Sequence, residues 1–326
     1  MPNTLNPLEL IARRWQPSAR FVRRAALATV VMAVVIVVTG GAVRLSDSGL
    51  GCSTWPQCTP GSLTPTAAMG VHGLIEFGNR MLTYVLCAVV GVFIIAARAQ
   101  QPRRRSLTKL GWAQFWIILA NAPVGGITVL TGLNPYIVAA HFLLSTALLT
   151  VAVLSWQRAC EGDEEPRDLV ARPVRQLAWL LVLASGALTV VGTLVTGSGP
   201  HAGDARQVHR IAVNWREITQ LHVDLAYIVV GLSVALWFTL RAVKAPAAPR
   251  KAVLQLFAVL ALQGVFGYVQ YFLGLPAFVV GLHMFGSTLV WIAVLRVFLT
   301  LRERGPVPAV PGPADRLEVL EPQPAA

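Results

Sequence analysis

Four of the six histidines in this sequence could bind the same kind of ligand. They are His72, His141, His222 and His283, and each lies near the start of a long run of apolar residues. A single histidine at such a position most often binds a backbone carbonyl, but four at matching positions point to a shared role. Imidazole is the usual axial ligand of haem iron, and a four-helix unit can hold a porphyrin between facing histidines. Zinc is the weaker interpretation, because most of these histidines have no cysteine or carboxylate cluster beside them.

A dense polar patch surrounds Glu76. His72 precedes it by four residues, and Asn79 and Arg80 follow it by three and four residues. On a helix these side chains would line one stripe. Two interpretations are open. Glu76 and Arg80 form an ion pair that eases burial, or the carboxylate lies beside a bound redox centre, where it moves protons or stabilises positive charge.

Helices that cross a lipid bilayer must position these side chains. Hydrophobic residues make up 55% of the 326 residues and charged residues only 13%, whereas a soluble domain carries about a quarter charged residues. The formal charge of +12 would suggest a nucleic-acid partner for a soluble protein, but the basic residues occur in short clusters between apolar runs. The lipid bilayer is therefore the expected partner, and a nucleic acid is not.

The apolar runs predict eight helices. One helix needs roughly 20 apolar residues to cross about 30 Å of hydrocarbon, and two of the runs are long enough for a pair of helices. Gly and Pro divide those two runs, at residues 131–136 and 273–277. The expected helices lie near 21–43, 71–97, 108–130, 136–157, 176–198, 219–241, 252–274 and 278–301.

Basic residues orient these helices. Arg and Lys concentrate in the N-terminal segment and in every second loop, which places both termini on the cytoplasmic side of the cell membrane. The four histidines then share one depth in the outer half of the membrane. Asp163 lies in an inner loop, where it is interpreted as part of a solvated turn.

The four cysteines fall into two classes. Cys52 and Cys58 have five residues between them in the first outer loop. On the oxidising face of a membrane this spacing fits a disulfide better than a metal site. Cys87, within a span, and Cys160, on the inner side, are expected to be unpaired thiols.

An internal repeat divides the chain in two. His141 matches His283 at a spacing of about 142 residues, and Gly125 matches Gly267 at the same spacing. We therefore predict an all-α integral membrane protein whose eight transmembrane helices form two tandem four-helix-bundle repeats. The expected parts are a cytoplasmic N-terminal segment (1–20), a first four-helix unit (21–157), a cytoplasmic linker (158–175), a second four-helix unit (176–301) and a disordered cytoplasmic tail (302–326).

Three segments of the chain resemble the haem A synthase family. They are Thr39–Cys58, which ends in Cys-Ser-Thr-Trp-Pro-Gln-Cys, Glu76–Arg80 and Thr196–Asp204, and the likeness extends from about Val22 to Leu301. Members of this family are integral membrane enzymes that oxidise the C8 methyl of haem O to a formyl group by successive hydroxylations. Their product, haem A, goes to terminal oxidases. The resemblance thus implies a haem O oxidoreductase supplied by a haem O synthase, with an electron donor that the sequence does not identify.

The resemblance also implies roles for individual residues. His222 and His283 would be the axial ligands of a haem b iron in the second unit, which is the side of the resident cofactor. His141 would bind the iron of the substrate haem in the first unit, and Glu76 would be the catalytic carboxylate. The remaining members of the implied site are Cys52 and Cys58 as a disulfide, and Asn79, Arg80 and His72 as further contacts of the substrate haem.

One position departs from the family pattern. Asn79 stands where the family commonly has a histidine, and it is the repeat partner of His222. An amide is a poor ligand for haem iron, so two-histidine ligation is not expected in the first unit. A vacant position at the substrate iron suits oxygen activation. His72 lies two turns away, about 10 Å along the helix axis, which is too far to replace Asn79.

Two other classes of protein compete with a haem-modifying enzyme. A di-haem cytochrome b that only passes electrons would also place histidines in bundles, but it would prefer two complete pairs of ligands. A transporter would have polar residues and Gly-broken helices near the middle of the membrane, whereas the polar groups here lie near the outer ends of the helices. Haem A synthesis is the leading hypothesis, and the electron-transfer cytochrome is the alternative.

Overall fold

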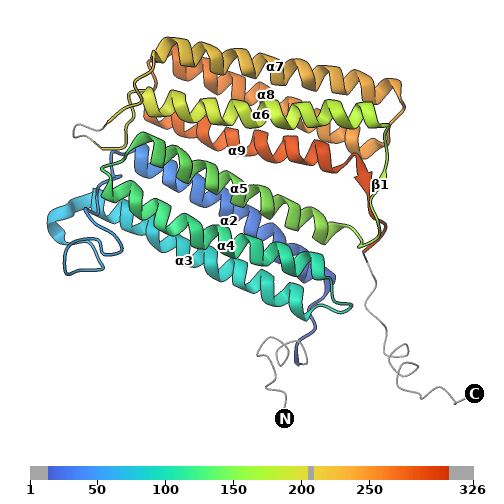
Figure 1. Cartoon of the computed structure of the whole chain (residues 1–326), viewed down its shortest axis with the longest axis horizontal. Coiled ribbons are helices and arrows are strands. Elements are labelled where there is room, and N and C mark those ends of the chain that lie inside the picture. The colour runs from blue at the N-terminus through green and yellow to red at the C-terminus, as the bar shows by residue number, and fades with distance from the viewer. Residues whose placement is uncertain (1–13, 205–208, 308–326) are drawn as a thin grey trace, which may run out of the picture.

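Long helices dominate the part of the chain that the computed structural model describes, residues 14–204 and 209–307 (Figure 1). The eight long helices of this part are α2 (Ala19–Leu45), α3 (Gly70–Ala99, after the short 3-10 helix η1 at Ala67–Met69), α4 (Arg105–Leu130), α5 (Pro135–Cys160), α6 (Arg172–Ser198), α7 (Trp215–Ala242), α8 (Ala247–Phe272) and α9 (Ala277–Leu299). Each is long and apolar enough to cross a membrane, so the predicted all-α membrane fold is confirmed. Residues 1–13 of the predicted N-terminal segment and 308–326 of the predicted tail lie outside the described residues.

N-capping side chains and glycine turns set several of the helix boundaries. Ser18, Asn134 and Asn214 cap α2, α5 and α7, each by accepting a hydrogen bond from the backbone of the first turn. The predicted breaks are tight turns with a left-handed backbone at Gly132 (φ 61°) and Gly274 (φ 73°). Every helix begins one to five residues before its predicted start, because polar and basic residues can continue a helix into the headgroup region.

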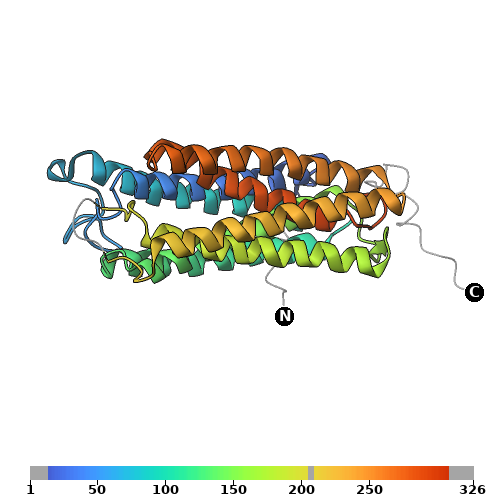
Figure 2. The same ribbon diagram turned by 90° about the horizontal axis from the view of Figure 1, so that it is seen from above.

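The helices form two groups of four. In the first group α2 packs on α3, α3 on α4, α4 on α5 and α5 on α2, and α6 to α9 are arranged in the same cyclic order. Figures 1 and 2 show the helices side by side along the long axis, with α6–α9 above α2–α5 in Figure 1. Leu295 and Leu299 of α9 belong to the apolar core of the first group, so the groups share buried surface. That the two groups are copies of one sequence stays a prediction.

The two ends of the bundle differ in what they carry. The end with the α2–α3 connection (residues 46–66) is termed the loop end, and the end with the α5–α6 connection is termed the linker end. At the linker end, strand β1 (Arg167–Asp168) pairs antiparallel with strand β2 (Arg302–Glu303). The disordered tail was expected to begin at residue 302, but the first two of its residues form β2, because the ladder with the linker satisfies their backbone groups.

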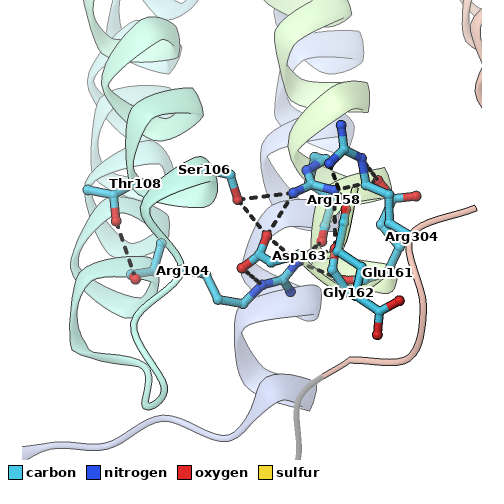
Figure 3. A network of polar contacts seen from close by, with 10 residues as sticks. Arg104, Ser106, Thr108, Arg158, Glu161, Gly162, Asp163 and Arg304 are labelled. Atoms are coloured by element: carbon cyan, nitrogen blue, oxygen red, sulfur yellow. Dashed lines mark hydrogen bonds and ion pairs between the residues drawn. The ribbon is translucent and has the colours of Figure 1, made fainter. Parts of the chain in front are cut away.

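A buried arginine shows that Asp163 is not part of a merely solvated turn. Arg104 is 2% exposed, and it donates hydrogen bonds to the Asp163 carboxylate (2.8 Å) and to the carbonyls of Arg158 and Glu161. Arg158 and Ser106 also donate to Asp163 (Figure 3). Burial acts to raise the pKa of Asp163, but the hydrogen bonds and the two positive charges outweigh it, so the pKa is lowered. The network fastens the start of α4 to the linker.

Candidate functional site

A facing pair of imidazoles lies in the second four-helix group. His222 of α7 and His283 of α9 have ring centroids 6.3 Å apart, with an angle of 62° between the ring planes. The Nδ1 atoms of both rings are buried and have no hydrogen-bond partner. A buried polar atom without a partner costs free energy unless a ligand satisfies it. The pair is therefore a candidate ligand site.

Glycines make room for these two rings. A Cβ added at Gly192 of α6 would lie 3.2 Å from Cε1 of His222, and one at Gly267 of α8 would lie 3.5 Å from Cε1 of His283. Each ring thus packs directly on the backbone of a neighbouring helix. A larger residue at Gly192 would meet the His222 ring and require it to shift.

The separation of the rings suits an iron held between them. A metal–imidazole bond is about 2 Å long, and a ring nitrogen lies roughly 1 Å from its ring centroid, so a shared metal ion sets the centroids roughly 6 Å apart. Among the described residues there is no group of three or more His, Cys, Asp or Glu side chains that could hold a metal ion. A metal held by this pair alone would need to bring its other ligands with it, as the iron of a porphyrin does. The residues present fit a haem.

His141 has similar surroundings in the first group. It lies on α5, and a Cβ added at Gly125 of α4 would be 3.0 Å from its Cε1 atom. Its Nδ1 atom is also buried without a hydrogen-bond partner. His141, His222 and His283 lie six or seven residues after the first residue of their helices, so they share one depth below the loop end.

Asn79 does not offer a second ligand to the first group. Its Oδ1 atom accepts a hydrogen bond of 2.8 Å from Thr39 Oγ1, which joins α3 to α2. The amide oxygen is therefore already engaged by a neighbouring helix. His72 lies at the exposed start of α3, where its Nδ1 atom is 2.9 Å from Ser48 Oγ. The structure thus gives His72 a partner in the α2–α3 connection.

Glu76 connects α3 to the loop between Cys52 and Cys58, which is termed the disulfide loop. The carboxylate is 6% exposed, and it accepts hydrogen bonds of 2.6 Å from the Cys52 backbone N–H and from the Arg80 guanidinium. Arg80 also donates to the carbonyls of Thr54 and Gln57. The ion pair expected from the i, i+4 spacing is present, but sequence reasoning missed the loop contacts, because nothing in the spacing reports how a loop folds back.

The disulfide loop lies over the first group. Cys52 and Cys58 form the expected disulfide, and both are fully buried. Between them, Trp55 packs on the backbone of Gly126 in α4, where any Cβ would overlap the indole ring. Gly126 directly follows Gly125, which packs against the ring of His141. The loop therefore covers the part of the first group that holds His141.

Hydrogen bonds at the loop end connect the end of α2 and the residues after it in the first group to the end of α6 and the segment that follows it in the second group. Arg44, at the end of α2, donates to the carbonyls of His201 (2.7 Å) and Thr196 (2.8 Å). The backbone N–H of Gly49 donates to the carbonyl of Gly203 (2.8 Å). The segments 39–58, 76–80 and 196–204, which carried the family resemblance, thus meet at one end of the bundle.

Comparison with protein families decides where the chain belongs. The COX15-CtaA family model, described as "Cytochrome oxidase assembly protein", matches residues 23–295. This chain belongs to the COX15-CtaA family. The matched range begins in α2 and ends in α9, so the family covers all eight spanning helices of the described residues.

Curated relatives of this COX15-CtaA protein carry the name "Heme A synthase". The one from Lysinibacillus sphaericus (strain C3-41) is 32% identical over 151 residues, which are 44% of this chain and 48% of the relative. The one from Staphylococcus epidermidis is 30% identical over 180 residues, 53% of this chain and 56% of the relative. The one from Geobacillus thermodenitrificans is 27% identical over 150 residues, 46% of each. The chain spans about half the length of the curated relatives it matches.

Proposed function

We propose that this protein is a haem A synthase, which oxidises the C8 methyl of haem O to a formyl group by successive hydroxylations and so provides haem A for terminal oxidases. The observation that carries the proposal is the facing pair His222 and His283, whose buried Nδ1 atoms have no hydrogen-bond partner. Membership of the COX15-CtaA family and the names of the relatives support the same reaction.

In this proposal the second unit holds haem b. His222 and His283 would hold its iron, and Gly192 and Gly267 keep the space beside their rings free. Haem b, when bound, supplies single-electron transfer. The surrounding apolar helices exclude water and fix the two rings, so this unit serves as a permanent electron-transfer site.

The first unit receives haem O as the substrate, through His141. Asn79 is tied to Thr39 by its amide oxygen, so His141 would hold the haem iron without a second histidine at position 79. A reacting haem needs such an open position, whereas a haem that only carries electrons gains from two ligands. Asn79 therefore favours the enzyme over the di-haem cytochrome.

Glu76 is the proposed catalytic carboxylate. Oxidation of a methyl at the porphyrin edge develops positive charge and releases protons, and a nearby carboxylate can stabilise the charge or accept a proton. The Cys52 N–H and the Arg80 guanidinium hold Glu76 in place and stabilise its ionised form. The disulfide loop above it limits the access of water.

The proposed setting is the cell membrane, with both termini in the cytoplasm and a haem O synthase as the supplier of substrate. The concentration of basic residues at the linker end supports this orientation. The disulfide at the loop end supports it as well, because disulfides persist on the oxidising side of a membrane.

The test is to express the chain with a haem O synthase in a host that makes no haem A, and to separate the extracted haems by chromatography. We expect haem A only when both proteins are present. A folded protein that carries a haem b spectrum while the membranes contain haem O alone would contradict the proposal and favour the electron-transfer cytochrome.

A further inference from the structure

A cavity of about 560 Å³ opens on the surface of α4 at the linker end, far along the helix from the histidines. Its lining includes three basic side chains, Arg103, Arg105 and Lys109, and two aromatic side chains, Trp112 and Trp116. All five are exposed. The cavity is therefore open to the surroundings of the bundle and separate from the candidate haem sites.

The lining residues are ordered along one face of the helix. Arg105, Lys109, Trp112 and Trp116 are spaced by four, three and four residues, so they form a single stripe. The stripe extends roughly 16 Å along the axis at about 1.5 Å per residue. Its basic end lies at the start of α4, where the helix dipole adds positive potential, and its aromatic end lies deeper along the span.

The positive charges of this cavity are not neutralised within the described part of the chain. No ion pair between described residues joins Arg103, Arg105 or Lys109 to a carboxylate. Their neighbour Arg104 shows the opposite arrangement, because it is buried and paired with Asp163. Three cations are thus left facing the boundary between lipid and water.

The two tryptophans have fixed rings below these charges. Phe115 contacts Trp112 edge-on at a centroid distance of 5.5 Å and Trp116 at 5.4 Å. Trp112 is 39% and Trp116 60% exposed, so both rings face the lipid. Tryptophan is favoured at the membrane interface, where its ring sits at the level of the headgroups and upper acyl chains.

We propose that this cavity is a binding site for an anionic phospholipid. The phosphate group contacts Arg103, Arg105 and Lys109, and the first part of the acyl chains lies along Trp112 and Trp116. Basic pockets on membrane helices attract acidic headgroups, and each Lys or Arg near the surface strengthens the attraction roughly fivefold. A soluble anion would use the charges alone, whereas a lipid uses the charges and the aromatic stripe together. The stripe is the reason to assign a lipid.

The test measures lipid preference in the purified full-length protein. The chain is reconstituted in phosphatidylcholine bilayers that contain a minor share of phosphatidylglycerol and is then extracted gently, and the retained lipids are counted by native mass spectrometry. We expect phosphatidylglycerol to be enriched over phosphatidylcholine on the wild type. The triple variant Arg103→Gln, Arg105→Gln, Lys109→Gln should reduce this enrichment by at least tenfold, given roughly fivefold for each charge.

A matched control removes the same charge elsewhere at the linker end. The variant Lys244→Gln, Arg250→Gln, Lys251→Gln changes three exposed basic residues, one in the α7–α8 connection and two near the start of α8, and it should keep the enrichment. Equal losses in the two triple variants would overturn the proposal, because the preference would then follow total charge. An unchanged enrichment in the first variant would overturn it as well. Circular dichroism of each variant verifies folding.

A second measurement separates a lipid from a free anion. Brominated phosphatidylglycerol should quench tryptophan fluorescence more than brominated phosphatidylcholine, and the excess should disappear in Trp112→Phe, Trp116→Phe. Inorganic phosphate should not compete at the same phosphorus concentration. Full displacement of the lipid by phosphate, together with unchanged quenching in the tryptophan variant, would assign the cavity to a soluble anion and overturn the lipid site.

Discussion

The two four-helix units place histidines at one depth and surround them differently. In the second unit His222 faces His283, and both Nδ1 atoms are buried without partners. In the first unit His141 has the same packing on a glycine, but the predicted repeat partner of His222 is Asn79, whose oxygen accepts a hydrogen bond from Thr39. Under the proposed function, this difference of one side chain would separate a site that retains its haem from a site that exchanges it.

The connections above the two units differ as well. The first unit carries the disulfide loop, with Trp55 packed on α4. The α6–α7 connection of the second unit contains no cysteine. A covered site with one strong ligand can admit and shield a reacting molecule, whereas a two-ligand site needs no such cover.

The largest expected effect is the loss of the haem b that we propose for the second unit. His222→Ala removes one of two facing ligands, so the low-spin haem b spectrum of the purified protein should disappear. The measurement is the visible absorption spectrum of the reduced protein, with folding verified by circular dichroism. His209→Ala, which changes an exposed loop histidine, is the control and should leave the spectrum intact. A full-intensity spectrum in folded His222→Ala would show that the second unit is not the retaining site.

Glu76→Gln tests the chemistry assigned to the first unit. The amide can still accept hydrogen bonds but carries no charge, so the haem A yield should fall by about 100-fold or more, the usual contribution of a general acid or base. Haem b should remain bound, and haem O or a hydroxylated intermediate should accumulate in the chromatogram. Glu217→Gln, at the start of α7, is the matched control. A wild-type yield from Glu76→Gln would remove its catalytic role, and loss of the folded protein would favour the structural ion pair with Arg80.

Asn79→His would make the first unit resemble the second. A histidine there supplies the missing ligand, so we expect a second low-spin haem signal and a haem A yield lower by roughly tenfold, which corresponds to about 1.4 kcal/mol in the barrier. The measurement combines the absorption spectrum with haem chromatography. Asn79→Gln is the control that adds length without an imidazole. A higher yield from Asn79→His would show that two ligands help the reaction, and the contrast between the units would fail.

The smallest expected effect concerns the linker that joins the units. The lowered pKa of Asp163 means that its ionised form stabilises the fold at pH values above the unfolded pKa of about 4, and this stabilisation is lost as the pH falls through the folded pKa. Because the side chain is partly exposed, solvent screens the interaction, and Asp163→Asn should cost less than about 1 kcal/mol. Thermal unfolding in detergent should show a small loss at neutral pH that vanishes in acid. A constant loss at every pH would contradict the charge-based explanation.

The spanning helices and the shared depth of His141, His222 and His283 could be predicted, because the thickness of the bilayer sets the length of each apolar run. The prediction was wrong for His72, which lies only two residues after the first residue of α3 and contacts the α2–α3 connection. His141 and His283 follow helix starts that Gly and Pro mark in the sequence, so their shared depth is a local property. The i, i+4 pair of Glu76 and Arg80 is local for the same reason. A disulfide between Cys52 and Cys58 also needed only spacing and topology.

The contacts of the loops could not be predicted, because they depend on how distant segments meet. The run Arg103–Arg105 shows the difficulty, since three identical side chains follow one another and only Arg104 is buried. Its partners lie more than fifty residues away, in the linker. Likewise, no pattern near Gly126 reports that Trp55 lies on it.

The pairing of β1 with β2 sets an order of events during synthesis. Gly162 and Leu169 leave the ribosome before the second unit exists, yet their backbone N–H groups donate to the carbonyls of Gly305 and Leu301, each at 2.9 Å. Chains fold from the N-terminus as they are made, so the linker must wait for α6 to α9 to be inserted before these bonds can form. Residues 301–305 thus fasten the linker, and a chain that stops short of Leu301 would leave the backbone N–H groups of Gly162 and Leu169 without these acceptors.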